Sequence, residues 1–143
     1  MNRRLLLAAA AGLALAAWGV ERLVVTDREA IDRVLEDAAA DVSKRDWDAF
    51  AAAVDDGYAE RGRDKQAFVG WVRGLYESRH PAGVGVDVDD TTVDGDRAAT
   101  RVVVKPGAPY AGIRVNGRVE FVRTPAGWRI SGVATDDLGF LGR

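Results

Sequence analysis

The spacing of hydrophobic residues changes near Gly83, and this change limits the fold more than any other feature of the sequence. Before Gly83, apolar residues recur every three or four positions, as in helices that bury one face. After it, Val84, Val86 and Val88 alternate with Gly and Asp, as in a strand with one buried face. Helices followed by strands predict an α+β domain, in which the helices pack on one face of an antiparallel meander sheet.

Three helices are expected before Gly83, and a capping residue precedes each of them. The capping residues are Thr26, Asp46 and Asp64. Thr26 forms a capping box with Glu29. The predicted helices end at about residue 44, at Gly57 and at His80-Pro81.

Five strands are expected after Gly83. Their predicted ranges are about 84–93, 96–105, 110–115, 118–124 and 127–135. Asp94-Gly95 and Asn116-Gly117 are each interpreted as a two-residue hairpin turn, because both positions of such a turn favour residues that tolerate positive φ. Residues 124–127 predict a third turn.

Length and composition predict one ordinary domain. The chain has 143 residues, 48% of them hydrophobic, which is enough for a single core. It contains no cysteine, so disulfides, thiolate zinc sites and a lipid-modified amino-terminal cysteine are excluded. The net charge is −2, and removing residues 1–26, with one acidic and three basic side chains, leaves −4. A mildly acidic domain argues against a nucleic-acid partner.

The amino terminus is typical of an export signal. Arg3 and Arg4 precede sixteen uncharged residues, 5–20, which match the charged and apolar regions of a secretory signal. Small residues at 14–16 suit cleavage, whereas the apolar residues 23–25 extend the segment toward the length of a membrane anchor.

We therefore expect residues 1–26 to be a signal peptide or a signal anchor. Residues 27–143 then form the exported domain. That domain is held outside the cytoplasmic membrane by an uncleaved helix, or is secreted or periplasmic after cleavage.

Four short segments carry a resemblance to a known family. They are KRDWDAF between the first two predicted helices, YAERG before the third, VDGDRAATRVVV across the first predicted hairpin and GWRISGV in the last strand. With the order of helices and then strands, these segments resemble the nuclear-transport-factor-2-like superfamily, which includes SnoaL-like and ketosteroid-isomerase-like proteins, over roughly residues 27–136.

The resemblance implies a cystatin-like cone, in which a strongly curved sheet wraps a long helix and leaves a pocket open at one end. In this superfamily the cone serves isomerases, dehydratases, epoxide hydrolases, polyketide cyclases, small-ligand binders and dimerising modules. Function therefore has to be argued from the residues that line the pocket.

Glu60 lies near the position where ketosteroid-isomerase-like members place a general base. In that enzyme an Asp base works with a Tyr and a protonated Asp that stabilise the enolate. The first predicted helix here contains no Tyr, and the strand residues expected to face inward include no carboxylate. In one interpretation Glu60 is a base and Tyr58 an orienting donor; in the other, Tyr58 packs under the third helix and Glu60 pairs with Arg61 or Arg63 in solvent.

Five aromatic residues are candidates for the lining of a ligand pocket, although residues at this spacing more often belong to a core. They are Trp47, Phe50, Phe68, Trp71 and Trp128. His80 is the one histidine, so a histidine-rich metal site and chemistry with paired histidines are excluded. The aspartates around Asp94 lack the loop of a calcium site, and no cofactor or metal is expected.

These observations predict an exported, non-catalytic domain that binds a small apolar ligand or associates with other proteins. The resemblance implies a homodimer through the exposed sheet face as its first partner. The alternative is an isomerase or cyclase that acts on a small hydrophobic substrate, with Glu60 as base and Tyr58 as donor. A structural module of a larger envelope assembly is a third interpretation.

Overall fold

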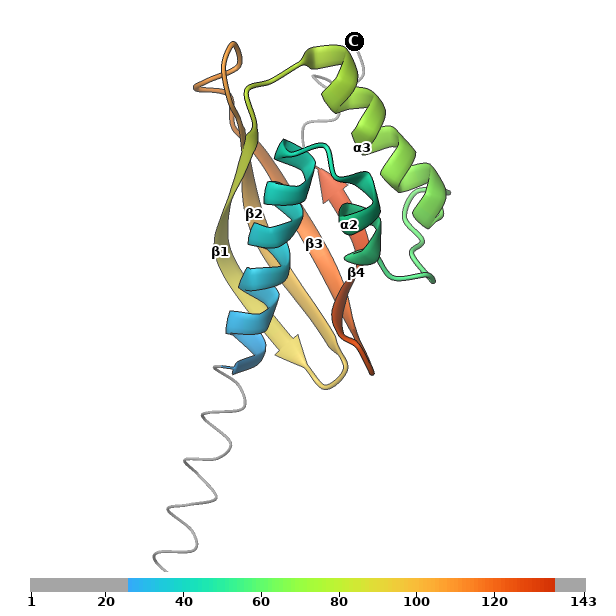
Figure 1. Ribbon diagram of the computed structural model, residues 1–143. Coiled ribbons are helices and arrows are strands. Elements are labelled where there is room, and N and C mark those ends of the chain that lie inside the picture. The colour runs from blue at the N-terminus through green and yellow to red at the C-terminus, as the bar shows by residue number, and fades with distance from the viewer. Residues whose placement is uncertain (1–25, 136–143) are drawn as a thin grey trace, which may run out of the picture.

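The computed structural model describes residues 26–135, so the predicted signal or anchor lies outside the described residues except for Thr26. No helix within 26–135 has both the length and the apolar character that a membrane crossing requires. In this part of the chain three helices precede four strands, and the helices lie on one face of the sheet (Figure 1). The predicted α+β arrangement is confirmed.

The described part of the first helix covers residues 26–43, followed by α2 (Trp47–Ala52) and α3 (Lys65–Arg79). Asp46 and Asp64 cap α2 and α3 as predicted, each accepting a hydrogen bond from the amide three residues on, at 3.1 and 2.8 Å. Residue 26 is already helical, whereas the sequence predicted it as the cap that precedes the helix.

α2 ends before the predicted stop at Gly57, because the chain turns there to pair with the last strand. The Ala53 carbonyl accepts a hydrogen bond from the Ile130 amide at 2.9 Å, and the Asp55 amide donates to the Ile130 carbonyl at 2.8 Å. The sheet thereby gains a short partner along its edge.

The sheet is an antiparallel meander in the order β1-β2-β3-β4. The strands are β1 (Val84–Asp94), β2 (Arg97–Pro106), β3 (Val115–Thr124) and β4 (Gly127–Thr135). Register shifts between Val88 and Asp90 and between Glu120 and Phe121 mark bulges, which bend the strands and increase their twist.

The third predicted strand, 110–115, and the Asn116-Gly117 hairpin are wrong. Residues 107–114 form turns, and β3 starts at Val115, with Asn116 and Gly117 paired to β2 inside it. A Cβ at Gly117 would lie 3.1 Å from the Ala134 carbonyl oxygen. This glycine therefore serves a close approach between strands and not a turn.

The core lies between the helices and the sheet face they cover. Its most deeply buried large side chains are Ile31 of the first helix, Val54 after α2, and Thr100 and Phe121 of the sheet. Within this face the valines of β1 and β2 meet the apolar stripe of the first helix.

A polar cluster joins the start of the first helix to the β3–β4 hairpin. The Arg123 guanidinium donates to both carboxylate oxygens of Asp27, at 3.0 and 2.8 Å, and lies 4.4 Å from the centre of the Trp128 ring. The Trp128 indole also donates to Asp27, at 3.3 Å. We call these three residues the Asp27 clasp; it fixes the helix across one end of the sheet (Figure 1).

Candidate functional site

An apolar cavity of about 290 Å³ lies between the three helices and the inner face of the sheet. Its wall includes Leu35 and Val42 from the first helix, Trp71 and Leu75 from α3, and Val104 from β2. These side chains come from segments distant in sequence, and the curvature of the sheet brings them around one space. The resulting cavity is the pocket that the cone resemblance implied.

Few polar groups enter this wall. Among the described residues that line the cavity, Arg79 is the one charged residue, and it is half-buried in the last turn of α3. The Tyr76 hydroxyl donates to the Ser43 carbonyl at 3.4 Å, which turns its polar end toward the first helix. Tyr110 and Thr135 contribute the remaining side-chain hydroxyls of the described wall.

Three of the five aromatic candidates, Phe50, Phe68 and Trp71, line the cavity. The other two belong to the surrounding packing. Trp47 makes edge contacts with Phe50 and Tyr76, at ring-centre distances of 6.3 and 6.0 Å. Trp128 is buried in the Asp27 clasp. The aromatic cluster therefore divides into cavity wall and supporting core.

Tyr58 is buried, and the structure places its ring against α3. The ring stacks on Phe68 with 4.5 Å between centres, and its hydroxyl accepts a hydrogen bond from the Val133 amide at 3.2 Å. Burial raises the pKa of Tyr58, although the hydrogen bond with Val133 acts in the opposite direction. The phenol thus accepts a hydrogen bond from a backbone amide on the edge strand β4. Tyr58 is not one of the cavity-lining residues.

Glu60 lies outside the described cavity wall as well. Its backbone forms a short bridge with Arg63, with hydrogen bonds of 3.2 and 2.9 Å. Carboxylate oxygens of Glu60 and Glu120 each lie 3.2 Å from the point where a Cβ on Gly132 would stand. Glu120 and Gly132 are opposite each other on β3 and β4, facing away from the helices, so Glu60 reaches the outer face of the sheet.

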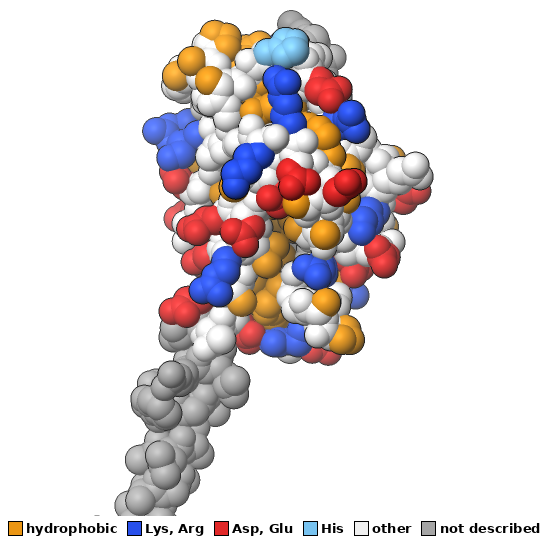
Figure 2. All heavy atoms as spheres, in the orientation of Figure 1, with side chains coloured by type: hydrophobic (Ala, Val, Ile, Leu, Met, Phe, Trp, Pro, Cys, Tyr) orange, Lys and Arg blue, Asp and Glu red, His pale blue; other side chains and the backbone are white. Residues whose placement is uncertain are grey.

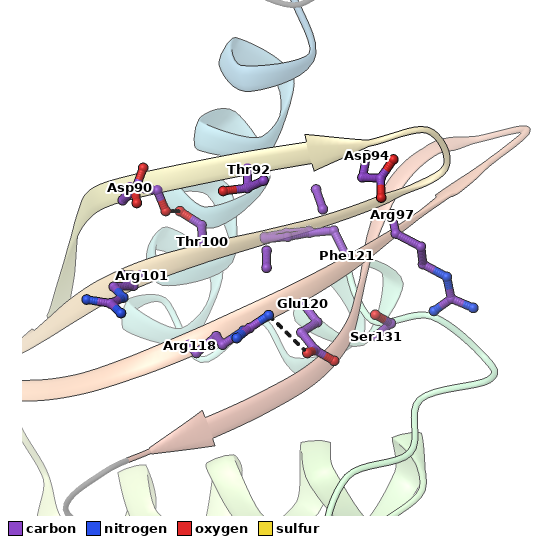
Figure 3. A pocket seen from close by; sticks show the side chains of 12 residues that line it. Asp90, Thr92, Asp94, Arg97, Thr100, Arg101, Arg118, Glu120, Phe121 and Ser131 are labelled. Carbon is purple, nitrogen blue, oxygen red and sulfur yellow. Dashed lines mark hydrogen bonds and ion pairs between the residues drawn. The ribbon is translucent and has the colours of Figure 1, made fainter.

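The outer face of the sheet carries a second, polar hollow of about 520 Å³. Figure 3 shows Arg118 directed toward Glu120, to which it is joined at 3.7 Å, while Arg97 and Arg101 extend from β2. Acidic and basic residues both line this hollow. Figure 2 shows the same mixture of charges over the helical side of the molecule, with hydrophobic side chains exposed near His80.

Sequence reasoning missed several residues of the cavity wall. Tyr76 follows Val72 by four positions on α3, and Thr135 follows Val133 by two positions on β4. Both spacings keep residues on one face, so spacing alone would have placed Tyr76 and Thr135 on inward faces. Tyr110 carries no such signal because it lies in the turns after β2. Within residues 26–135 no group of three or more His, Cys, Asp or Glu side chains is placed to hold a metal ion.

The architecture and its cavity define the NTF2-like class of fold, also described as cystatin-like, and comparison with solved structures confirms this. An NTF2-like protein with a cystatin-like fold from Novosphingobium aromaticivorans is 23% identical and has a TM-score of 0.65, with 85% of this chain and 88% of that chain covered. An NTF2-like protein of unknown function from Shewanella baltica is 14% identical, with a TM-score of 0.60 and coverage of 78% and 94%.

A domain of unknown function with a cystatin-like fold from Nostoc punctiforme is 15% identical, with a TM-score of 0.61 and coverage of 77% and 76%. No protein-family model and no curated protein matches the sequence. These likenesses establish the fold that the resemblance implied.

Proposed function

We propose that this domain binds a small apolar molecule in the cone cavity and does not turn it over through Glu60. The observation that carries the proposal is the wall, which is apolar apart from a few groups among the described residues. Small-molecule sites are concave, mostly apolar and supplied with few polar groups. A volume of about 290 Å³ lies at the lower end of the range for such sites, which limits the ligand to a small molecule.

The position of Glu60 favours binding over the isomerase or cyclase alternative. A general base has to come within hydrogen-bond reach of the proton that it removes. Glu60 lies beside Glu120 on the outer face of the sheet, and Tyr58 already accepts the Val133 amide. Neither group is available to a molecule inside the cavity in this arrangement.

The test is a titration with 2-methylnaphthalene, monitored by tryptophan fluorescence and by calorimetry. Fluorescence is suitable because Trp71 lines the cavity. Val104→Phe fills the cavity and should weaken binding by at least about tenfold, since a fully buried apolar group contributes about that much or more. Val103→Phe is the matched control: it changes the adjacent residue of β2, which points to the outer face.

Saturable binding that Val104→Phe abolishes and Val103→Phe leaves within about twofold would support the proposal. Equal affinity in both variants would place the ligand elsewhere and overturn it. Glu60→Gln should leave the affinity unchanged; a loss of binding in this variant would instead favour the enzyme alternative.

For protein association we propose a second copy of this chain on the outer face of the sheet. The outward side chains of β1 form an acidic row, Asp87, Asp90 and Asp94, beside a basic row on β2, Arg97, Arg101 and Lys105. Under a two-fold axis the acidic row of one copy lies over the basic row of the other. Export by residues 1–26 stays a prediction from the sequence.

A further inference from the structure

We infer that apolar side chains of the segment 136–143 occupy the cone cavity of their own chain when no ligand is bound. This segment follows β4 and lies outside the described residues. Its sequence is Asp-Asp-Leu-Gly-Phe-Leu-Gly-Arg. The cavity then has an occupant from the protein itself, which any ligand must displace; only that competition rests on the proposed function.

The described part of β4 ends in the cavity wall. Val133 and Thr135 both line the cavity, so the segment is attached directly beside it. An extended chain advances at most about 3.3–3.6 Å per residue, so residues 138–141 can reach about 10–20 Å from Thr135. This reach exceeds the width of a cavity of about 290 Å³. A segment attached beside a site has a far higher effective concentration there than the same segment of another molecule.

The segment also has the chemistry that the wall accepts. It contains three large apolar residues, Leu138, Phe140 and Leu141. Val72 and Leu75 of α3 line the cavity and are only half-buried, so a further apolar group would remove more of their surface from water. Such a group needs no hydrogen-bond partner in a wall that offers few. In an extended segment alternate residues share a side, so Leu138 and Phe140 can enter the cavity together.

The charges favour the same path for the segment. Asp136 and Asp137 come directly after Thr135. Arg79, at the end of α3, is the one charged residue of the described wall. Because Thr135 and Arg79 line one cavity, the two acids can approach the guanidinium as the segment crosses the opening. An ion pair near the surface contributes little, so we expect these charges to guide the segment and the apolar contacts to hold it.

The experiment replaces Leu138, Phe140 and Leu141 with serine in the full chain. Loss of the apolar occupant should lower the thermal unfolding midpoint by about 3–6 °C, the shift that a modest loss of stability produces in a domain of this size. The matched control is Gly142→Ser with Arg143→Ser, which changes the same segment and keeps its three large apolar residues. It should leave the midpoint within about 1 °C of wild type.

The Val104→Phe variant tests where the occupant lies. This substitution fills the cavity, so the serine substitutions should shift the midpoint by less than about half as much in this background as in wild type. In the Val103→Phe background, where the added ring points to the outer face, the full shift should remain. The serine variant should also bind 2-methylnaphthalene about three- to tenfold more tightly, as expected if the cavity of the wild-type chain is open in about a third to a tenth of the molecules.

An unchanged midpoint in the serine variant, or equal shifts in the Val104→Phe and Val103→Phe backgrounds, would overturn this inference. The proposed function would still stand if 2-methylnaphthalene bound. A shift that grew with protein concentration would assign the occupant to a second copy and would also overturn the inference. If 2-methylnaphthalene bound neither the wild-type chain nor the serine variant, the proposed function would fail, whereas a shift that Val104→Phe suppresses would still support the occupant.

Discussion

Gly107 marks a place where two connections of the chain touch. A Cβ on Gly107 would lie only 2.2 Å from the Ala82 carbonyl oxygen, and the Gly107 amide donates to the Gly83 carbonyl at 2.9 Å. We expect Gly107→Ala to lower the free energy of unfolding by about 1–3 kcal/mol, because the backbone must move to admit the methyl group. Urea denaturation measures the change.

Gly70→Ala is the matched control for this substitution. Gly70 is exposed in the middle of α3, and nothing lies within 4 Å of its Cβ position. Alanine there should stabilise the protein by about 0.5–1 kcal/mol, since glycine is a poor helix former. If both variants lost stability equally, the close approach at Gly107 would not explain its effect.

At the residue scale, periodicity indicates which aromatic residues face inward. Phe50, Phe68 and Trp71 were candidates for a pocket wall or for the core, because their spacing marks inward helix faces, and in the structure they contribute to the cavity wall. The same spacing could not separate a cavity wall from the solid core next to it, so Trp47 was grouped with them. Within residues 26–135 the buried Thr135 hydroxyl lacks a hydrogen-bond partner, a property that depends on atoms a few ångströms away and that a sequence pattern does not record.

The Asp27 clasp joins two elements that are almost a hundred residues apart in the chain. Hydrogen bonds from Arg123 hold the pKa of Asp27 below its usual range. A lowered pKa adds stability at pH values above the ordinary carboxyl pKa of about 4, and this contribution disappears as the pH falls toward the lowered value. Asp27→Asn should therefore cost roughly 1 kcal/mol at neutral pH and progressively less in acid.

Denaturant midpoints measured from neutral pH down to about pH 3 check this expectation. Asp96→Asn is the control, because Asp96 also faces Arg123, at 3.6 Å, but is 83% exposed. An exposed ion pair of this kind contributes little to the free energy of unfolding. A difference between Asp27→Asn and wild type that stayed constant with pH would rule out the ion pair as its source.

The elements themselves were largely predictable from local chemistry. Asp46 and Asp64 correctly indicated the starts of two helices. The first hairpin loop consists of Gly95 and Asp96, one residue later than predicted. The hairpin turn predicted at Asn116-Gly117 was wrong because a glycine in a sequence can serve either a backbone position with positive φ or a close contact. The second use became visible only when β4 was seen beside β3.

At the scale of the molecule, the proposed association through the rows of opposite charge on the outer face should be sensitive to salt and to charge reversal. We expect a dimer in native mass spectrometry and sedimentation at low salt, and monomers near 0.5 M salt, where the Debye length falls to roughly 4 Å. Arg101→Glu should prevent association.

The double variant Asp90→Arg with Arg101→Glu exchanges the charges of a cross-strand pair. It keeps the rows complementary to an identical copy, and it should restore the dimer. Association of Arg101→Glu alone at wild-type strength would exclude this face as the interface.

The Asp27 clasp also fixes the end of the domain at which the described part of the chain begins. The chain enters the domain beside the β3–β4 hairpin, whereas the turns after β2 and the end of α3, which contribute Tyr110 and Arg79 to the cavity wall, lie at the far end (Figure 1). Residue 26 therefore lies at the end of the domain that carries the β3–β4 hairpin. A fusion partner joined at residue 26 would therefore be attached at the end of the domain away from Tyr110 and Arg79.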